Sequence, residues 1–135
     1  MKSPVEHVRI SARGKDTLQR VKRNTGLEHW NEICRIALCR SLNDASPPPI
    51  SSKHTDCALE IEWKTFLGKY HDELLSCFMI QAKKDGIDLT RKEDVAGYFR
   101  AHIERGIDGM KNMKLTDYLT TVTSRGKSDL QGADK

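Results

Sequence analysis

The sequence predicts a mainly α-helical protein that folds as a single compact domain. At 135 residues, of which only 37% are hydrophobic, the chain has room for one modest core. Several stretches space their apolar residues as one face of a helix does, and the broadest of them is Glu28–Leu42. Three consecutive prolines then interrupt the chain, and they separate an N-terminal half, residues 1–46, from a C-terminal helical half.

The chain begins with a short predicted strand in the stretch Pro4–Ser11. Val8 and Ile10 share one face of an extended chain, while His7 and Arg9 share the other. A single short strand is not stable by itself, and the first half of the chain offers it no partner. We therefore expect the strand to pair with the same strand of a second copy of the chain.

Two predicted helices follow, joined by a tight turn. Ser11 is expected to cap the first helix, Lys15–Thr25, and Gly26 to close it in a left-handed conformation. The second helix has one broad buried face, made by Trp30, Ile33, Cys34, Ala37, Leu38 and Leu42. A strand, a basic helix, a glycine turn and an apolar helix form the layout of a ribbon-helix-helix module. The predicted fold is therefore a ribbon-helix-helix-like N-terminal half joined to a C-terminal helical half.

A proline-rich linker is predicted over residues 47–56, because consecutive prolines impose a stiff, extended spacer. After it, Leu59, Ile61 and Trp63 alternate with charged residues. Such alternation suggests a half-buried strand or an extended arm at the start of the second half.

The rest of the second half, which extends to residue 123, is predicted to be helical. Apolar stripes predict a helix over residues 69–85 and another that begins at Arg91, where Thr90 and Glu93 have the spacing of a capping box. The last predicted segments are a short helix, Met110–Thr121, and a disordered polar tail, residues 124–135.

The basic excess of the chain lies in its first 40 residues. They carry nine Lys or Arg and four Asp or Glu, a net +5, whereas the remaining 95 residues carry 14 and 15, a net −1. A local excess of this size favours a polyanionic partner. The expected nucleic-acid contacts are the long basic side chains that lie off the apolar faces: Arg9, Arg13, Lys15, Arg20, Lys22 and Arg23.

Apolar side chains are expected to hold several subunits together. A modest core and a strand without a partner both favour an oligomer, which buries additional apolar surface. The residues assigned to the subunit interface are Val8, Ile10, Trp30, Ile33 and Leu38.

The sequence contains no recognisable catalytic or metal-binding motif. The four cysteines show no CxxC spacing, the five histidines are scattered, and neither a glycine-rich phosphate loop nor an HExxH motif is present. We therefore expect no enzymatic activity, cofactor or metal, although a Cys–His nucleophilic pair stays open because such pairs meet only in space. His102, beside an apolar stripe, is expected to be a packed histidine. Since no apolar run approaches the roughly 20 residues of a membrane span, we expect a cytoplasmic protein.

Four segments in order resemble the DndE family of the bacterial DNA phosphorothioation machinery. They are NTGLEHWNEICRIALCRSL, EIEWKTFLGKY, KKDGIDL and YFRAHIERGID, and the resemblance spans roughly Val8–Met110. It implies a homotetrameric, non-catalytic subunit that binds the backbone of double-stranded DNA, notably at nicks, with little sequence reading. The resemblance also implies partner proteins of DNA sulfur modification: a cysteine desulfurase, an iron-sulfur protein and an ATP-dependent component. Because Glu28 and Glu32 lie at the start of the second helix, phosphate contacts are expected elsewhere.

Two other functions stay open. A ribbon-helix-helix transcriptional repressor or antitoxin needs base-reading side chains on its exposed strand face, where this chain has only Val5, His7 and Arg9. A protein-only adaptor would use its basic half against an acidic protein surface. Backbone binding needs only Lys and Arg, which are plentiful in the first 40 residues.

Overall fold

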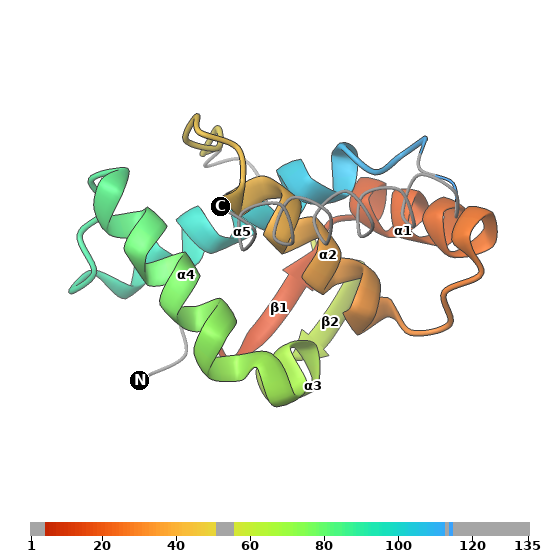
Figure 1. The fold of residues 1–135 in the computed structure, drawn as a ribbon, viewed down its shortest axis with the longest axis horizontal. Coiled ribbons are helices and arrows are strands. Elements are labelled where there is room, and N and C mark those ends of the chain that lie inside the picture. The colour runs from red at the N-terminus through yellow and green to blue at the C-terminus, as the bar shows by residue number, and fades with distance from the viewer. Residues whose placement is uncertain (1–4, 51–55, 113, 115–135) are drawn as a thin grey trace, which may run out of the picture.

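The computed structural model describes residues 5–50, 56–112 and 114, which form a mainly helical domain with a two-stranded sheet (Figure 1). Four helices have 13 residues or more, and a shorter helix and a 3-10 turn follow the second strand. The elements in chain order are β1 His7–Ile10, α1 Ala12–Thr25, α2 Trp30–Leu42, β2 Leu59–Glu62, α3 Trp63–Leu67, η1 Gly68–Tyr70, α4 His71–Lys84 and α5 Lys92–Asp108.

The first strand pairs within its own chain, so the prediction that it pairs with a second copy is wrong. β1 and β2 are antiparallel, with Val8 opposite Ile61 and Arg9 opposite Glu60. Each strand turns alternate apolar residues to the core, and the exposed residues between them are basic on β1 and acidic on β2. The chain therefore supplies both strands of its ribbon, whereas a ribbon-helix-helix module takes one from each subunit.

The helical hairpin of the first half agrees with the sequence prediction. The Ser11 hydroxyl accepts a hydrogen bond from the Gly14 amide, which caps α1, and the helix starts at Ala12 rather than at residue 15. Gly26 has a φ of 76°, and its amide donates to the Lys22 carbonyl. That left-handed conformation suits glycine, and it lets α2 begin four residues later.

The second half differs from the prediction at two places. Helix α3 begins at Trp63, directly after β2, although Trp63 was expected to continue the alternating strand or arm. Helix α5 begins at Lys92, but the expected capping box does not form, because the Thr90 hydroxyl donates to the Asp88 carboxylate instead. Helix α4 lies inside the predicted range.

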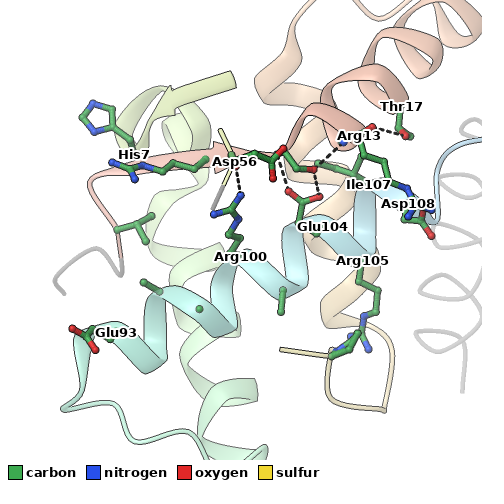
Figure 2. A pocket seen from close by; sticks show the side chains of 18 of the residues that line it. His7, Arg13, Thr17, Asp56, Glu93, Arg100, Glu104, Arg105, Ile107 and Asp108 are labelled. Atoms are coloured by element: carbon green, nitrogen blue, oxygen red, sulfur yellow. Dashed lines mark hydrogen bonds and ion pairs between the residues drawn. The ribbon is translucent and has the colours of Figure 1, made fainter. Parts of the chain in front are cut away.

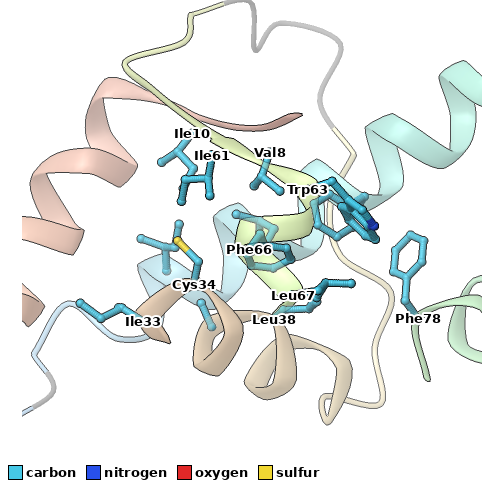
Figure 3. Close-up of a cluster of buried hydrophobic side chains, with 14 of the residues drawn as sticks. Val8, Ile10, Ile33, Cys34, Leu38, Ile61, Trp63, Phe66, Leu67 and Phe78 are labelled. Carbon is cyan, nitrogen blue, oxygen red and sulfur yellow. The ribbon is translucent and has the colours of Figure 1, made fainter. Parts of the chain in front are cut away.

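One core joins the two halves across the linker. Figure 3 shows Val8, Ile10 and Ile61 of the strands pointing towards Cys34 of α2 and Phe66 of α3. Four of the five residues assigned to a subunit interface are core residues of this single chain: Val8, Ile10, Ile33 and Leu38, each at most 1% exposed. Trp30 is half-buried at the edge of that core. The broad apolar face of α2 is thus covered by its own chain.

Helices α2 and α5 approach each other closely at one glycine. A Cβ atom placed on Gly106 of α5 would lie 2.0 Å from the Ala37 carbonyl oxygen of α2. Ser41 lies one turn further along α2 than Ala37. The guanidinium of Arg105, the residue before Gly106, donates to both the hydroxyl and the carbonyl of Ser41, at 2.9 and 2.8 Å. The same guanidinium donates to the Ser46 carbonyl, so it ties the start of the linker to α5.

A buried histidine completes this interface. His102 is 0% exposed, and its Nδ1 lies 2.8 Å from the Ser41 hydroxyl, as expected for a packed, hydrogen-bonded histidine. That hydroxyl also accepts a hydrogen bond from the Arg105 guanidinium, so it links the histidine to the arginine. Burial, reinforced by the Arg105 charge, lowers the pKa of His102 to about 4, while Asp85 and Asp44 oppose this shift.

Some predicted segments lie outside the described residues. These are the middle of the linker, residues 51–55, most of the expected terminal helix, Met110–Thr121, and the polar tail, residues 124–135. Within the described part of the chain, no helix is long and apolar enough to cross a membrane.

We expect Gly106→Ala to destabilise the protein by at least about 2 kcal/mol, because the added methyl group has no space beside the α2 backbone. Gly97→Ala, on the same helix, is the matched control, since the nearest atom to its Cβ is 3.9 Å away. The control is expected to be neutral or stabilising by up to about 1 kcal/mol. Urea unfolding measures both, and equal midpoints for the two variants would contradict the close contact.

Acid is expected to destabilise the fold through His102. The unfolded imidazole takes up a proton near its ordinary pKa of 6.5, whereas the folded one stays neutral down to about pH 4. The contribution is therefore complete above about pH 6.5 and falls by up to about 1.4 kcal/mol per pH unit between these values. His102→Gln removes the titration, so the pH dependence of its free energy of unfolding should be shallower than that of the wild type. Identical pH slopes would exclude this origin.

Candidate nucleic-acid interface

Helix α1 presents five basic side chains and one acidic one, and its apolar residues face the core. Its buried residues form one stripe: Gly14, Leu18, Val21 and Thr25. Positions seven residues apart lie on the same side of a helix, so Lys15 and Lys22 line one edge of the exposed face. Arg13 and Arg20 line the other edge, and Arg23 lies between them. The exposed face of α1 is therefore mainly basic, with Asp16 as its acidic side chain.

Four of these cations have no ion pair within the described part of the chain. No carboxylate of the described residues lies within 4 Å of Lys15, Arg20, Lys22 or Arg23. The Lys22 ammonium lies 5.7 Å from the centre of the Trp30 ring, which orients this charge at the start of α2. We call Lys15, Arg20, Lys22 and Arg23 the α1 cations.

The other two predicted contacts are already paired. The Arg9 guanidinium lies 3.1 Å from the Glu60 carboxylate of β2, and the Arg13 guanidinium lies 3.2 Å from Asp108 of α5. Both arginine side chains stay more than half exposed. The structure therefore separates the six predicted contact residues into four cations of α1 without an ion pair to any described residue and two paired arginines, Arg9 of β1 and Arg13 in the first turn of α1.

Carboxylates occupy the N-terminus of α1. Glu104 accepts hydrogen bonds from the Ser11 amide and hydroxyl, both at 2.9 Å, and the Ala12 amide donates to the Asp56 carboxylate at 2.9 Å. Helix α2 has Glu32 in its first turn. Free helix amides attract phosphate, but carboxylates at both helix starts repel it. Any phosphate contact of this half therefore falls to side chains.

A groove of about 920 Å³ lies beside the basic helix, with β1 along one side and α5 along the other (Figure 2). Ala96, Gly97 and Ala101 of α5 line it with small side chains. Arg100 reaches from α5 to the Asp56 carbonyl. The sequence analysis did not predict this groove, although Ala96, Gly97 and Ala101 mark a side of α5 with small residues.

Sequence analysis also missed a basic and aromatic cluster near α3. Arg35 of α2 donates to the Phe66 carbonyl at 2.8 Å, and its guanidinium carbon lies 5.8 Å from the centre of the Tyr70 ring. The Lys69 ammonium lies 5.2 Å from the same ring, which is 47% exposed. In the sequence, this cluster is indicated by Tyr70, the aromatic residue that follows the EIEWKTFLGK stretch.

The described residues bring no nucleophile and base together in an open site. Burial raises the pKa of the Cys34 thiol to about 12, with a smaller contribution from Glu104, so this thiol stays protonated at neutral pH. His102 is enclosed, and His71 is paired with Asp72 at 3.1 Å. No group of three or more His, Cys, Asp or Glu residues in the described ranges is arranged to hold a metal ion.

Comparison with known proteins relates this chain to one family. A search of curated proteins gives no match. Among solved structures, the chain is similar to the crystal structure of DndE from Escherichia coli B7A, a protein involved in DNA phosphorothioation modification. The two share 21% sequence identity and a TM-score of 0.66, over 81% of this chain and 99% of that chain. That likeness shows a common fold.

The family relationship rests on a sequence model rather than on the shared fold. The model of the DNA sulphur modification protein DndE matches residues 7–117, which include both strands, every helix described above and the basic face of α1. The match extends across the linker, and it agrees with the resemblance carried by the four sequence segments. The chain therefore belongs to the DndE family of DNA sulphur modification proteins.

Proposed function

We propose that this protein is a non-catalytic, DNA-binding subunit of the phosphorothioation system, and that it binds the backbone of double-stranded DNA, nicks included, with little sequence specificity. The observation that carries the proposal is the set of four α1 cations, which lie on one exposed helix face and have no carboxylate partner among residues 5–50 and 56–112. Family membership supports it, because phosphorothioation is a modification of the DNA backbone.

Phosphate contacts account for this type of binding. Each Lys or Arg that neutralises a phosphate releases a condensed counterion, so affinity falls with salt and does not depend on the bases. The α1 cations serve this role without first breaking an ion pair. Arg9 and Arg13 contribute less in this proposal, because each exchanges an existing carboxylate for phosphate.

A homotetramer completes the proposal, with the number of subunits taken from the resemblance to the DndE family. Repetition of the α1 face on each subunit multiplies the phosphate contacts along one duplex, which raises avidity without new types of contact. The apolar residues originally assigned to the interface are enclosed in the core, so Trp30 is the one member of that set at the surface.

Binding to DNA of unrelated sequences separates the alternatives. A repressor or antitoxin would read bases with an exposed β-ribbon, but here Arg9, the long side chain on that face, is paired with Glu60. A protein-only adaptor would not bind random-sequence DNA at moderate salt. The α1 cations, which have no carboxylate partner among the described residues, favour phosphate contacts over base reading, and the DNA-binding measurement separates backbone binding from the adaptor.

A Lys22→Glu, Arg23→Glu double variant is expected to bind duplex DNA at least about tenfold more weakly, a loss of roughly 1.4 kcal/mol. Each lost phosphate contact should also lower the slope of log affinity against log salt by roughly 0.9. Fluorescence anisotropy with several unrelated duplexes measures both, and the loss should be equal across sequences.

The matched control is Lys83→Glu, Lys84→Glu, which makes the same charge change in the last turn of α4, where both side chains are exposed. This control should bind DNA within about twofold of the wild type, because 0.15 M salt screens the interaction between DNA and charges that lie outside the binding face. Light scattering should give both variants the mass of the wild type, which we expect to be four times the 15.3 kDa chain. Equal losses in both variants, or a wild type that prefers one site strongly, would refute the assignment to α1.

The absence of catalysis is a separate prediction. We expect no nicking of supercoiled plasmid above background with magnesium, and no change in folding or DNA binding after treatment with EDTA. The high pKa of Cys34 and the enclosed His102 support this expectation. Gel analysis of plasmid topology and circular dichroism measure the two outcomes. Magnesium-dependent nicking, or loss of helicity in EDTA, would contradict the non-catalytic role.

A further inference from the structure

One edge of the β-ribbon has unused backbone groups. The Trp63 amide donates to the Glu6 carbonyl, so the backbone groups of Glu6 face β2. Because these groups alternate in direction along a strand, the amides and carbonyls of Val8 and Ile10 face β2 as well. The amides and carbonyls of His7 and Arg9 point the opposite way, and they form no hydrogen bond with any described residue. That outward edge borders the groove between β1 and α5, which is lined by both residues (Figure 2).

The charges of the groove are unsuited to a polyanion. Arg9 and Arg13 are paired with carboxylates, Arg105 donates to Ser41 and Ser46, and Arg100 donates to the Asp56 carbonyl. Five acidic side chains line the groove beside five basic ones: Glu6, Asp56, Glu93, Glu104 and Asp108, with Arg9, Arg13, Lys92, Arg100 and Arg105. A balanced charge of this kind matches an uncharged ligand, whereas the α1 cations match phosphate.

We propose that this groove binds an extended, uncharged segment of a partner protein, which adds to the outward edge of β1 as a third strand. An extended polypeptide supplies alternating donors and acceptors at the spacing of the His7 and Arg9 peptide groups. Ala96, Gly97 and Ala101 leave room for its side chains on the α5 side. The α1 cations do not line this groove, so peptide binding in the groove can be tested independently of DNA binding.

A single extended segment fits better than the strand of a second folded copy. In every copy, β1 lies beside its own α5, and the Ser11 hydrogen bonds to Glu104 hold those two elements together. Pairing two such edges would bring two α5 helices against each other. A segment without attached helices enters the groove freely.

Amide hydrogen exchange on the full chain tests whether the edge is open. We expect the His7 and Arg9 amides to exchange at nearly unprotected rates, and those of Val8 and Ile10 to be protected by β2. Protection of His7 and Arg9 that is independent of concentration means that the same chain covers the edge. Protection that grows with concentration means that a second copy does. Either result overturns the proposal.

Peptide selection tests the ligand class. Random nonapeptides displayed on phage are selected against the full chain, and the selected peptides are synthesised with one N-methyl group at each position in turn. N-methylation should weaken binding at alternate positions only, because every second amide of a third strand faces β1. A continuous or irregular pattern, enrichment of acidic peptides that bind the α1 cations, or no enrichment at all would overturn the proposal.

Proline at Arg9 identifies the edge. Arg9→Pro removes one outward amide and leaves the inward ladder intact, a position where strands tolerate proline. We expect this variant to bind selected peptides at least about tenfold more weakly, whereas Arg9→Ala, which keeps the amide, should bind within about twofold. Gly97→Leu, which fills the groove from α5, should also weaken binding, and its DNA affinity should match the wild type. Wild-type peptide affinity in both Arg9→Pro and Gly97→Leu would refute the site.

Discussion

The antiparallel pairing of β1 with β2 holds the two halves of the chain together. It joins residues 7–10 to residues 59–62, so it closes a loop that contains α1, α2 and the linker. Closing a loop of this length costs little more than closing a short one, because the entropy rises only with the logarithm of its length. The pairing buries Val8, Ile10 and Ile61 on one face, which turns towards Cys34 of α2 and Phe66 of α3 in the shared core. Without β2, the strand would expose both edges and its apolar face.

The same pairing decides which basic residues are available. Glu60 of β2 neutralises Arg9, and α5, packed beside β1, brings Asp108 to Arg13 and Glu104 to the start of α1. These contacts pair the arginines near the start of α1 with carboxylates, whereas the α1 cations on the exposed face keep their charge available. Two chemically distinct surfaces result: an exposed helix with unpaired cations and a groove whose charges balance. Such a division is consistent with the two proposals, in which the α1 cations contact phosphate and the groove binds an extended peptide segment.

The α2–α5 interface fixes the geometry of these surfaces. Gly106 lets the backbones of α2 and α5 come into contact. Beside this contact, Ser41, His102 and Arg105 form a hydrogen-bond network, in which the buried His102 Nε2 atom has no partner among the described residues. Buried polar groups cost free energy when unsatisfied, so the network restricts α5 to one position along α2. Since α5 carries Glu104 and Asp108, its position sets the charge around the start of α1.

Local patterns in the sequence predicted the four long helices, the glycine turn, the cap at Ser11 and the alternation of residues 59–62, because each depends on neighbours within a few positions. It also determined the DndE family relationship and placed the basic excess in the first 40 residues. The folded chain was needed to show that Leu59–Glu62 is the partner of His7–Ile10, and that the apolar face of α2 is covered within the chain. Likewise, it alone separated Arg9 and Arg13 from the four α1 cations. The physical reason is the same in each case: hydrogen bonds between strands and ion pairs act between residues tens of positions apart, and no local spacing records them.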